Sequence, residues 1–134
     1  VTQEKARANG IETDTTIMAF GGADLGRIVP VAFHIDSPPM RALVTVLAGA
    51  FLNPVEPAHF LGRMTGDILI INAEDDELIP PESAALMTRL APEPKWVVTM
   101  PGEHIDPRDP AMLRSVVDVT KAWLIERGAA NPER

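Results

Sequence analysis

The stretch DILIINAEDDELIPPESAALMTRLAPEPKWVVTMPGEHI, residues 67–105, decides the fold. An apolar run ends in an acidic turn, a short helical pattern follows, and a second apolar run ends in Gly-Glu-His. This order predicts strand, helix and strand, with Asp76 after the first strand and His104 after the second. Strands joined by a helical crossover run parallel, and the loops at their carboxyl ends share one edge of the sheet. The sequence therefore predicts that Asp76 and His104 lie close together.

The rest of the chain continues this alternation of strands and helices. Strands are predicted at residues 15–20, 67–73 and 95–100, and the unalternating Ile-rich run of the second is typical of a parallel strand covered on both faces. Helical patterns fall at the end of residues 1–10, from Asp36-Ser37-Pro38 to Asn53-Pro54, in residues 55–64, from Pro80-Pro81-Glu82 to Ala91-Pro92, and from Asp109 to Gly128. The predicted fold class is α/β, a parallel sheet flanked by helices in one domain over residues 1–134.

Gly21-Gly22 follows the first predicted strand. Two interpretations are open: a tight turn that requires positive φ, or a close approach of the backbone to a ligand.

Residues 24–63 carry the weakest pattern in the chain. The apolar segment 25–33 is expected to be broken at Pro30. The helix that follows has no charged residue from Ala42 to Val55. A helix that is apolar on all sides is typically buried, and this chain is too small to surround it. We therefore expect that helix to contact protein outside this chain or a second copy.

Composition limits the functions open to the chain. No cysteine is present, which excludes disulfides, thiolate catalysis and cysteine-bound zinc. The net charge of −7 opposes binding to phosphate backbones, so no nucleic-acid partner is expected. No apolar run approaches the length of a membrane span, about 18 residues, and no signal peptide is visible, so we expect a cytoplasmic protein. Because the chain starts at Val1, we expect that a preceding segment has been removed.

Residues 67–104 resemble the C-terminal part of an α/β-hydrolase. In that family the penultimate strand ends in small-x-x-Asp followed by apolar residues and Pro, here Ala73-Glu74-Asp75-Asp76 with Leu78, Ile79 and Pro80. The last strand is followed by Pro-Gly-x-His, here Pro101-Gly102-Glu103-His104. The resemblance implies that Asp76 is the catalytic acid and His104 the catalytic histidine. It covers residues 15–128, makes the three strands the last three of the family's sheet, and places a cap or lid segment at 24–63.

The sequence departs from the family pattern at two points. Ala73 replaces the common glycine, and no Gly-x-Ser-x-Gly nucleophile elbow occurs in the chain. The serines present are Ser37, Ser83 and Ser115, which are expected at a helix cap, in a first helical turn and inside a helix. The chain is thus expected to be the C-terminal portion of one hydrolase domain, with the serine on a missing segment or a separate chain.

The resemblance implies a hydrolase that cleaves esters or related acyl compounds by a Ser-His-Asp mechanism without a cofactor. Its expected partners are a small-molecule ester or acyl substrate, and the N-terminal half of the same protein or a second copy. The isolated chain is expected to be inactive. Esterase and peptidase activity both fit the motifs, and substrate, acyl length and oligomeric state stay open. The alternative is a non-catalytic α/β association module that uses an exposed strand edge and the apolar helix.

A competing interpretation takes residues 74–77, Glu-Asp-Asp-Glu, as an acidic magnesium pocket like that of phospho-receiver domains. The order of elements opposes it, because only one strand follows and Lys95 precedes that strand. A metal site built from His34, His59 and His104 has no supporting ligand spacing. His34 and His59 are expected to be packed or interfacial, and no metal is expected.

Overall fold

The computed structural model of the protein describes residues 8–10 and 13–130. The helix expected at the end of residues 1–10 therefore falls largely outside the described residues. The elements in chain order are β1 (Thr15–Ala19), α2 (Leu25–Ala32), α3 (Pro38–Leu52), η1 (Asn53–Val55), α4 (Ala58–Leu61), β2 (Asp67–Ala73), α5 (Pro81–Leu90), β3 (Lys95–Met100) and α6 (Pro110–Glu126).

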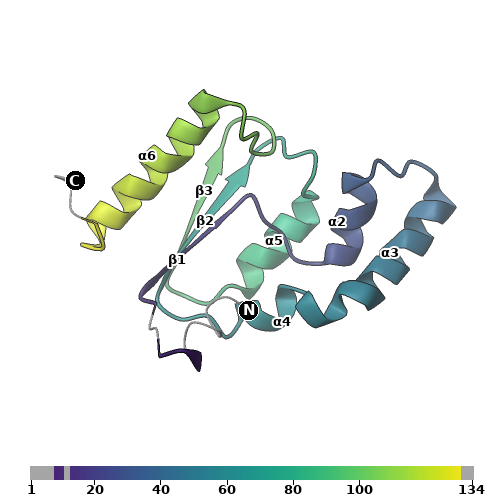
Figure 1. The fold of residues 1–134 in the computed structure, drawn as a ribbon, viewed down its shortest axis with the longest axis horizontal. Helices are drawn as coiled ribbons and strands as arrows, with labels where there is room; N and C mark the ends of the chain where they lie inside the picture. The colour runs from purple at the N-terminus through teal and green to yellow at the C-terminus, as the bar shows by residue number, and fades with distance from the viewer. Residues whose placement is uncertain (1–7, 11–12, 131–134) are drawn as a thin grey trace.

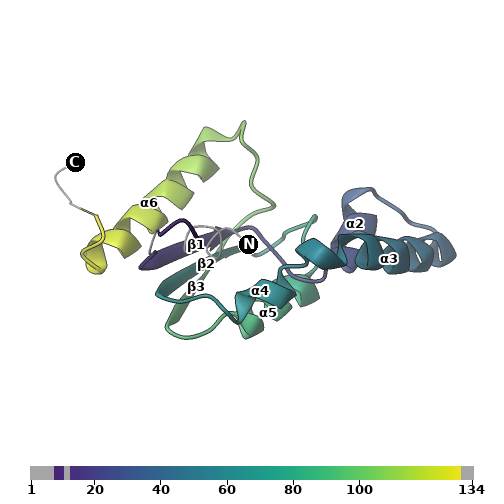
Figure 2. The ribbon, with the colours of Figure 1, turned by 60° about the horizontal axis from the view of Figure 1, so that its bottom comes forward.

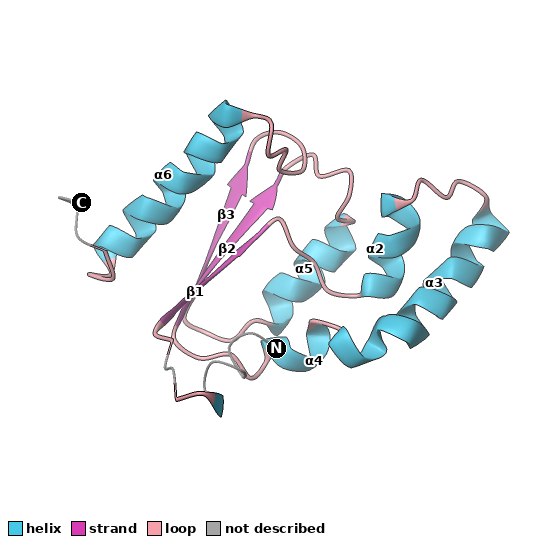
Figure 3. Cartoon of the chain, viewed as in Figure 1, coloured by secondary structure: helices cyan, strands magenta, loops and turns pink. Residues whose placement is uncertain are grey.

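The three strands form one parallel sheet in the order β1-β2-β3, and helices flank it (Figure 3). Strand β2 is central, and its residues Ile68 to Ile71 are fully buried. An unbroken run of large aliphatic side chains suits a parallel strand that is covered on both faces. The predicted α/β class is confirmed, and the bounds of β2 and β3 are those expected from the sequence.

Each face of the sheet has its own helical layer (Figure 2). Helices α4 and α5 cover one face over a core of Ala23, Leu61, Ile68, Ile70, Met87 and Ala91. Helix α6 covers the other face over a core of Phe20, Leu69, Ile71, Met100 and Trp123. The parallel pairing of β2 with β3 places their carboxyl ends side by side, where the loops to α5 and α6 begin (Figure 1).

Helices α2 and α3 form a hairpin that extends beyond α5, away from the sheet (Figure 1). The expected break at Pro30 is wrong, because Pro30 lies inside a continuous α2. An interior proline removes one helical hydrogen bond. Packing against α3 keeps α2 helical: Gly26 and Pro30 are buried, and a Cβ at Gly26 would lie 2.8 Å from the Thr45 carbonyl oxygen. Ser37 occupies the N-cap of α3, but its side chain makes no capping hydrogen bond, contrary to the cap expected there.

Helix α3 packs on one side against α2, but none of its residues is buried within the described part of the chain. Phe51 is 85% exposed, and Phe33 in the preceding loop is 74% exposed. The other large apolar side chains exposed on this hairpin and its continuation are Met40, Leu43, Val46, Leu47 and Val55. The expected contact of α3 with further protein therefore stays a prediction. Within residues 8–10 and 13–130, no helix combines the length and the apolar character needed to cross a bilayer.

The turn after β1 differs from the first interpretation of Gly21-Gly22. Neither glycine has positive φ; the left-handed residues here are Phe20 (φ 52) and Asp24 (φ 68). Gly22 is buried, and a Cβ at that position would lie 2.8 Å from Cγ2 of Ile79 and 3.1 Å from Cβ of Ser83. Gly22 thus permits close packing of the turn after β1 against Ile79 and the start of α5, since any side chain there would overlap its neighbours.

We expect Gly22→Ala to lower the free energy of unfolding by about 1–3 kcal/mol, because overpacking forces neighbouring groups to shift. Gly62→Ala is the matched control, since its Cβ would have no heavy atom within 4 Å. The measurement is urea denaturation of both variants and the parent at one protein concentration. Equal midpoints for the two variants would contradict the packing argument.

Candidate active site

The turn after β2 and the loop after β3 are joined by backbone hydrogen bonds. The Glu74 N–H donates to the Met100 carbonyl at 2.9 Å, and the Asp75 N–H donates to the Gly102 carbonyl at 3.0 Å. Gly102 has φ 106, a conformation that a residue with a side chain rarely adopts, so the glycine is required for this loop. These contacts extend the pairing of β2 and β3 past the ends of the strands and bring the acidic turn to His104.

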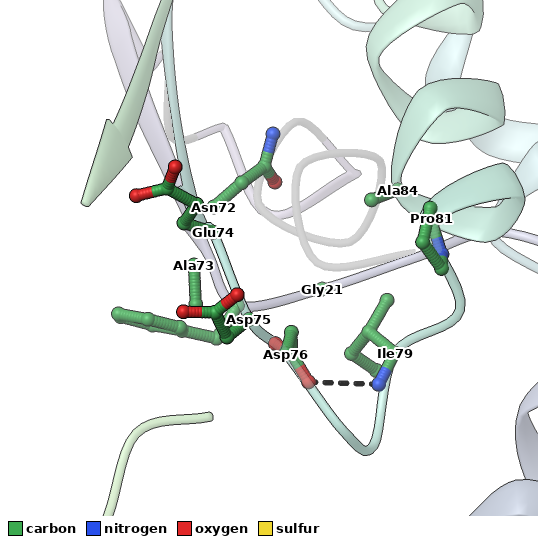
Figure 4. Close-up of a pocket in the computed structure, with 10 residues that line it drawn as sticks. Gly21, Asn72, Ala73, Glu74, Asp75, Asp76, Ile79, Pro81 and Ala84 are labelled. Atoms are coloured by element: carbon green, nitrogen blue, oxygen red, sulfur yellow. Dashed lines mark hydrogen bonds between the residues drawn. The ribbon is translucent and has the colours of Figure 1, made fainter. Parts of the chain in front are cut away.

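The predicted contact between Asp76 and His104 is confirmed. His104 Nδ1 lies 2.9 Å from Asp76 Oδ2 and 3.1 Å from Oδ1. Asp76 Oδ1 also accepts hydrogen bonds from the backbone N–H groups of Leu78 (2.9 Å) and Ile79 (2.8 Å). Figure 4 shows the bond from Ile79, with Asp76 in the turn that leads to α5. Two backbone N–H groups of the turn therefore fix Oδ1 of the carboxylate, and the imidazole contacts both of its oxygens.

The hydrogen-bonding pattern assigns the tautomer of the neutral imidazole. An ionised carboxylate only accepts hydrogen bonds, so Nδ1 of His104 carries the proton and donates it to Asp76. The other ring nitrogen, Nε2, then keeps its lone pair. The Asp76 side chain is 9% exposed, whereas the His104 side chain is 25% exposed. The pair thus combines a shielded acid with an imidazole that retains a solvent-accessible part.

Two open recesses border His104. One of about 420 Å³ is lined by His34, Glu77, Leu78 and the segment 103–108, and one of about 800 Å³ lies between the β3 end and α6. His34, expected to be packed or interfacial, is an exposed turn residue after α2 with φ 51. A smaller pocket of about 210 Å³ lies between the ends of β1 and β2 and the start of α5 (Figure 4).

The charges beside the recess are partly paired. Hydrogen bonds from the Arg108 guanidinium and backbone N–H lower the pKa of the Asp106 carboxyl below its usual value. The same contact raises the pKa of Arg108. The Arg108 charge is therefore paired with Asp106 at the exposed margin of the recess beside His104.

None of the three serines has the setting of an activated nucleophile. Ser37 is at the start of α3, and Ser83 is completely buried in the first turn of α5. Ser115 lines the larger recess together with His104, but it sits inside α6 and donates its hydroxyl to the Ala111 carbonyl at 3.1 Å. A serine inside a regular helix, with its hydroxyl bonded to a helix carbonyl, is not on the strained turn that exposes a nucleophilic serine.

The remaining candidate residues do not form a second centre. His59 is exposed on α4, where its ring packs edge-on against Phe60. Across residues 8–10 and 13–130, no three His, Asp or Glu side chains gather in a way that could hold a metal ion. The acidic run 74–77 supplies Asp76 to His104 rather than a cluster of free oxygen ligands.

Sequence reasoning missed two residues that shape this region. Glu56 accepts hydrogen bonds from the backbone N–H groups of Asp24 (2.7 Å) and Leu25 (2.8 Å), and so binds the start of α2. Phe20 packs its ring edge-on against His104, with 5.9 Å between the ring centroids. No local pattern marks either contact, because each joins segments distant in the chain.

The chain matches none of the protein-family models and none of the curated proteins with which it was compared. The site itself, an aspartate and a histidine joined after neighbouring parallel strands, is what indicates a function.

Proposed function

We propose that this chain supplies the acid and the histidine of a serine hydrolase that cleaves esters or related acyl compounds. The observation that carries the proposal is the 2.9 Å contact between Asp76 Oδ2 and His104 Nδ1, with Asp76 fixed by two backbone N–H groups. The resemblance to the C-terminal part of an α/β-hydrolase gives this pair its place after the last two strands.

The proposed chemistry follows from the tautomer of His104. With its proton on Nδ1, the imidazole uses Nε2 as general base to take the proton of an attacking serine hydroxyl. Asp76 orients the ring and stabilises the imidazolium that forms. The imidazolium then donates the proton to the leaving group, and the second half of the cycle repeats these steps with water. These reaction steps require no cofactor.

The nucleophile is proposed to come from a segment or chain outside residues 1–134. The three serines of this chain lie at the N-cap position of α3, buried in α5, or bonded within α6. A strand carrying the nucleophile would lie beside β1, because β1 is an outer strand of the three-stranded sheet in the described residues. A parallel strand added there would deliver a serine to the same edge of the sheet as His104.

A fluorophosphonate probe tests this assignment directly. We expect the probe to label a serine of a copurified or coexpressed partner and not Ser37, Ser83 or Ser115, because phosphonylation requires a hydroxyl activated by histidine. His104→Ala in this chain should abolish the labelling of the partner. Mass spectrometry of the labelled peptides identifies the modified serine.

The control is His59→Ala, which removes an exposed imidazole from α4 and should leave the labelling unchanged. Labelling that survives His104→Ala would remove His104 from the mechanism. Labelling of Ser115 would place the nucleophile in this chain.

The exposed apolar hairpin favours a second candidate function, a non-catalytic α/β module that associates through α3 and the β1 edge. Its support is that no α3 residue is buried and that Phe51 is 85% exposed. This function predicts stable association with a partner in which neither His104→Ala nor Asp76→Ala changes any activity. The labelling experiment separates the two candidates.

A further inference from the structure

Phe20 lies on the opposite face of the sheet from the one that strand geometry gives it. Successive strand residues alternate between the faces. Met18, which is level with Ile70, packs into the core on the α4–α5 side. Phe20 follows two positions later and should share that side, yet it belongs to the core under α6, with Ile71.

The backbone conformation of Phe20 produces this change of face. Its φ is 52, in the left-handed region that bulky residues rarely adopt. The chain nevertheless stays aligned with β2, because the Phe20 N–H donates to the Ile71 carbonyl at 2.8 Å. A strained conformation of this kind persists only where surrounding contacts hold it, and such residues cluster at functional sites.

The displaced ring reaches the imidazole of the candidate pair. Phe20 is 6% exposed, and its ring meets His104 edge-on, at an interplanar angle of 73° and a centroid distance of 5.9 Å. This T-shaped arrangement is one that aromatic pairs favour. Asp76 holds the imidazole at Nδ1, and Phe20 contacts its ring, so together they restrict both the position and the tilt of His104.

We propose that Phe20 is a positioning residue for His104. The left-handed backbone conformation of Phe20 places its ring against the imidazole. Without the ring, His104 leaves Asp76 more often and presents Nε2 in a less defined direction. The inference rests on the proposed function for its catalytic meaning. Its test reads the imidazole itself and needs no substrate, so failure of the positioning role and failure of the hydrolase assignment are distinguishable.

The test is ¹⁵N NMR of the full chain labelled at histidine, in solution or as a sediment if the chain associates. In the parent, His104 should show one neutral tautomer, with a slowly exchanging proton on Nδ1. Phe20→Leu keeps an apolar side chain but removes the ring. We expect exchange of that proton with water to become about two- to tenfold faster, the factor that an edge-on aromatic contact provides.

Three further variants make the result decisive. Phe20→Tyr keeps the ring and should restore the parent exchange rate. Ile71→Val weakens the same core without removing the ring and should leave the His104 signal unchanged. Phe20→Met, whose flexible side chain fills irregular gaps, replaces Phe20→Leu if that variant does not fold. Parent-like exchange in the ring-free variants, or an equal effect of Ile71→Val, would overturn the proposal.

Discussion

His104→Ala should abolish ester hydrolysis by the assembled enzyme, and Asp76→Asn should remove most of it. Loss of a triad histidine typically costs about six powers of ten in turnover, and the aspartate-to-asparagine change about four. Without His104, no group remains to take the proton of the attacking hydroxyl. The measurement is kcat/KM for a short activated ester, with this chain combined with its serine-bearing partner.

The Asp76→Asn effect follows from the contacts of the two carboxylate oxygens. Oδ1 accepts the N–H groups of Leu78 and Ile79, so an asparagine would keep its carbonyl oxygen there. Its NH₂ group would then replace Oδ2 and face the Nδ1–H of His104, donor against donor. The imidazole would have to move its proton to Nε2, which removes the base from the nucleophile.

Ser115→Ala is the matched control for these variants. Ser115 lines the same recess as His104, yet its hydroxyl is bonded to the Ala111 carbonyl within α6. We expect its kcat/KM to equal that of the parent. Activity of His104→Ala close to the parent value would exclude the imidazole from catalysis, whereas a large loss with Ser115→Ala would make Ser115 the nucleophile.

Residues 1–134 alone should show no esterase activity and should not behave as a monomer. A histidine and an aspartate without an activated hydroxyl have no nucleophile to deliver. Strand β1 is an outer strand of the sheet in the described part of the chain, and α3 exposes an apolar surface of the kind that marks association sites. The measurement is light scattering of the isolated chain, followed by an ester assay with and without the serine-bearing partner.

Two substitutions that each introduce one charge distinguish specific association through α3 from non-specific hydrophobic association. Phe51→Glu places a carboxylate on the exposed α3 surface, and Val117→Glu places one on α6, where Val117 is 59% exposed. We expect Phe51→Glu to reduce association and Val117→Glu to leave it unchanged. A compact monomer with turnover of its own would contradict the need for a partner. The nucleophile would then have to be sought among Ser37, Ser83 and Ser115.

Local pattern was sufficient to predict the sheet and the candidate pair. The unbroken apolar run from Ile68 to Ile71 favours a strand that is buried on both faces. The helical crossover that follows it makes the next strand a parallel neighbour. Once the strands are parallel, Asp76 and His104 follow at one edge of the sheet. Their contact depends on strand order and turn spacing, which are properties that short stretches of sequence express.

Contacts between distant segments account for the rest of the structure. Pro30 remains helical because α3 packs against α2, and Gly22 is needed because α5 approaches it, not because a turn requires positive φ. The change of face at Phe20 has no local signal at all: the alternation of the strand predicts the opposite side, and the core beneath α6 offsets the strained backbone. Spacing along the chain records which residues can face a core, whereas the free energy of packing decides which core receives them.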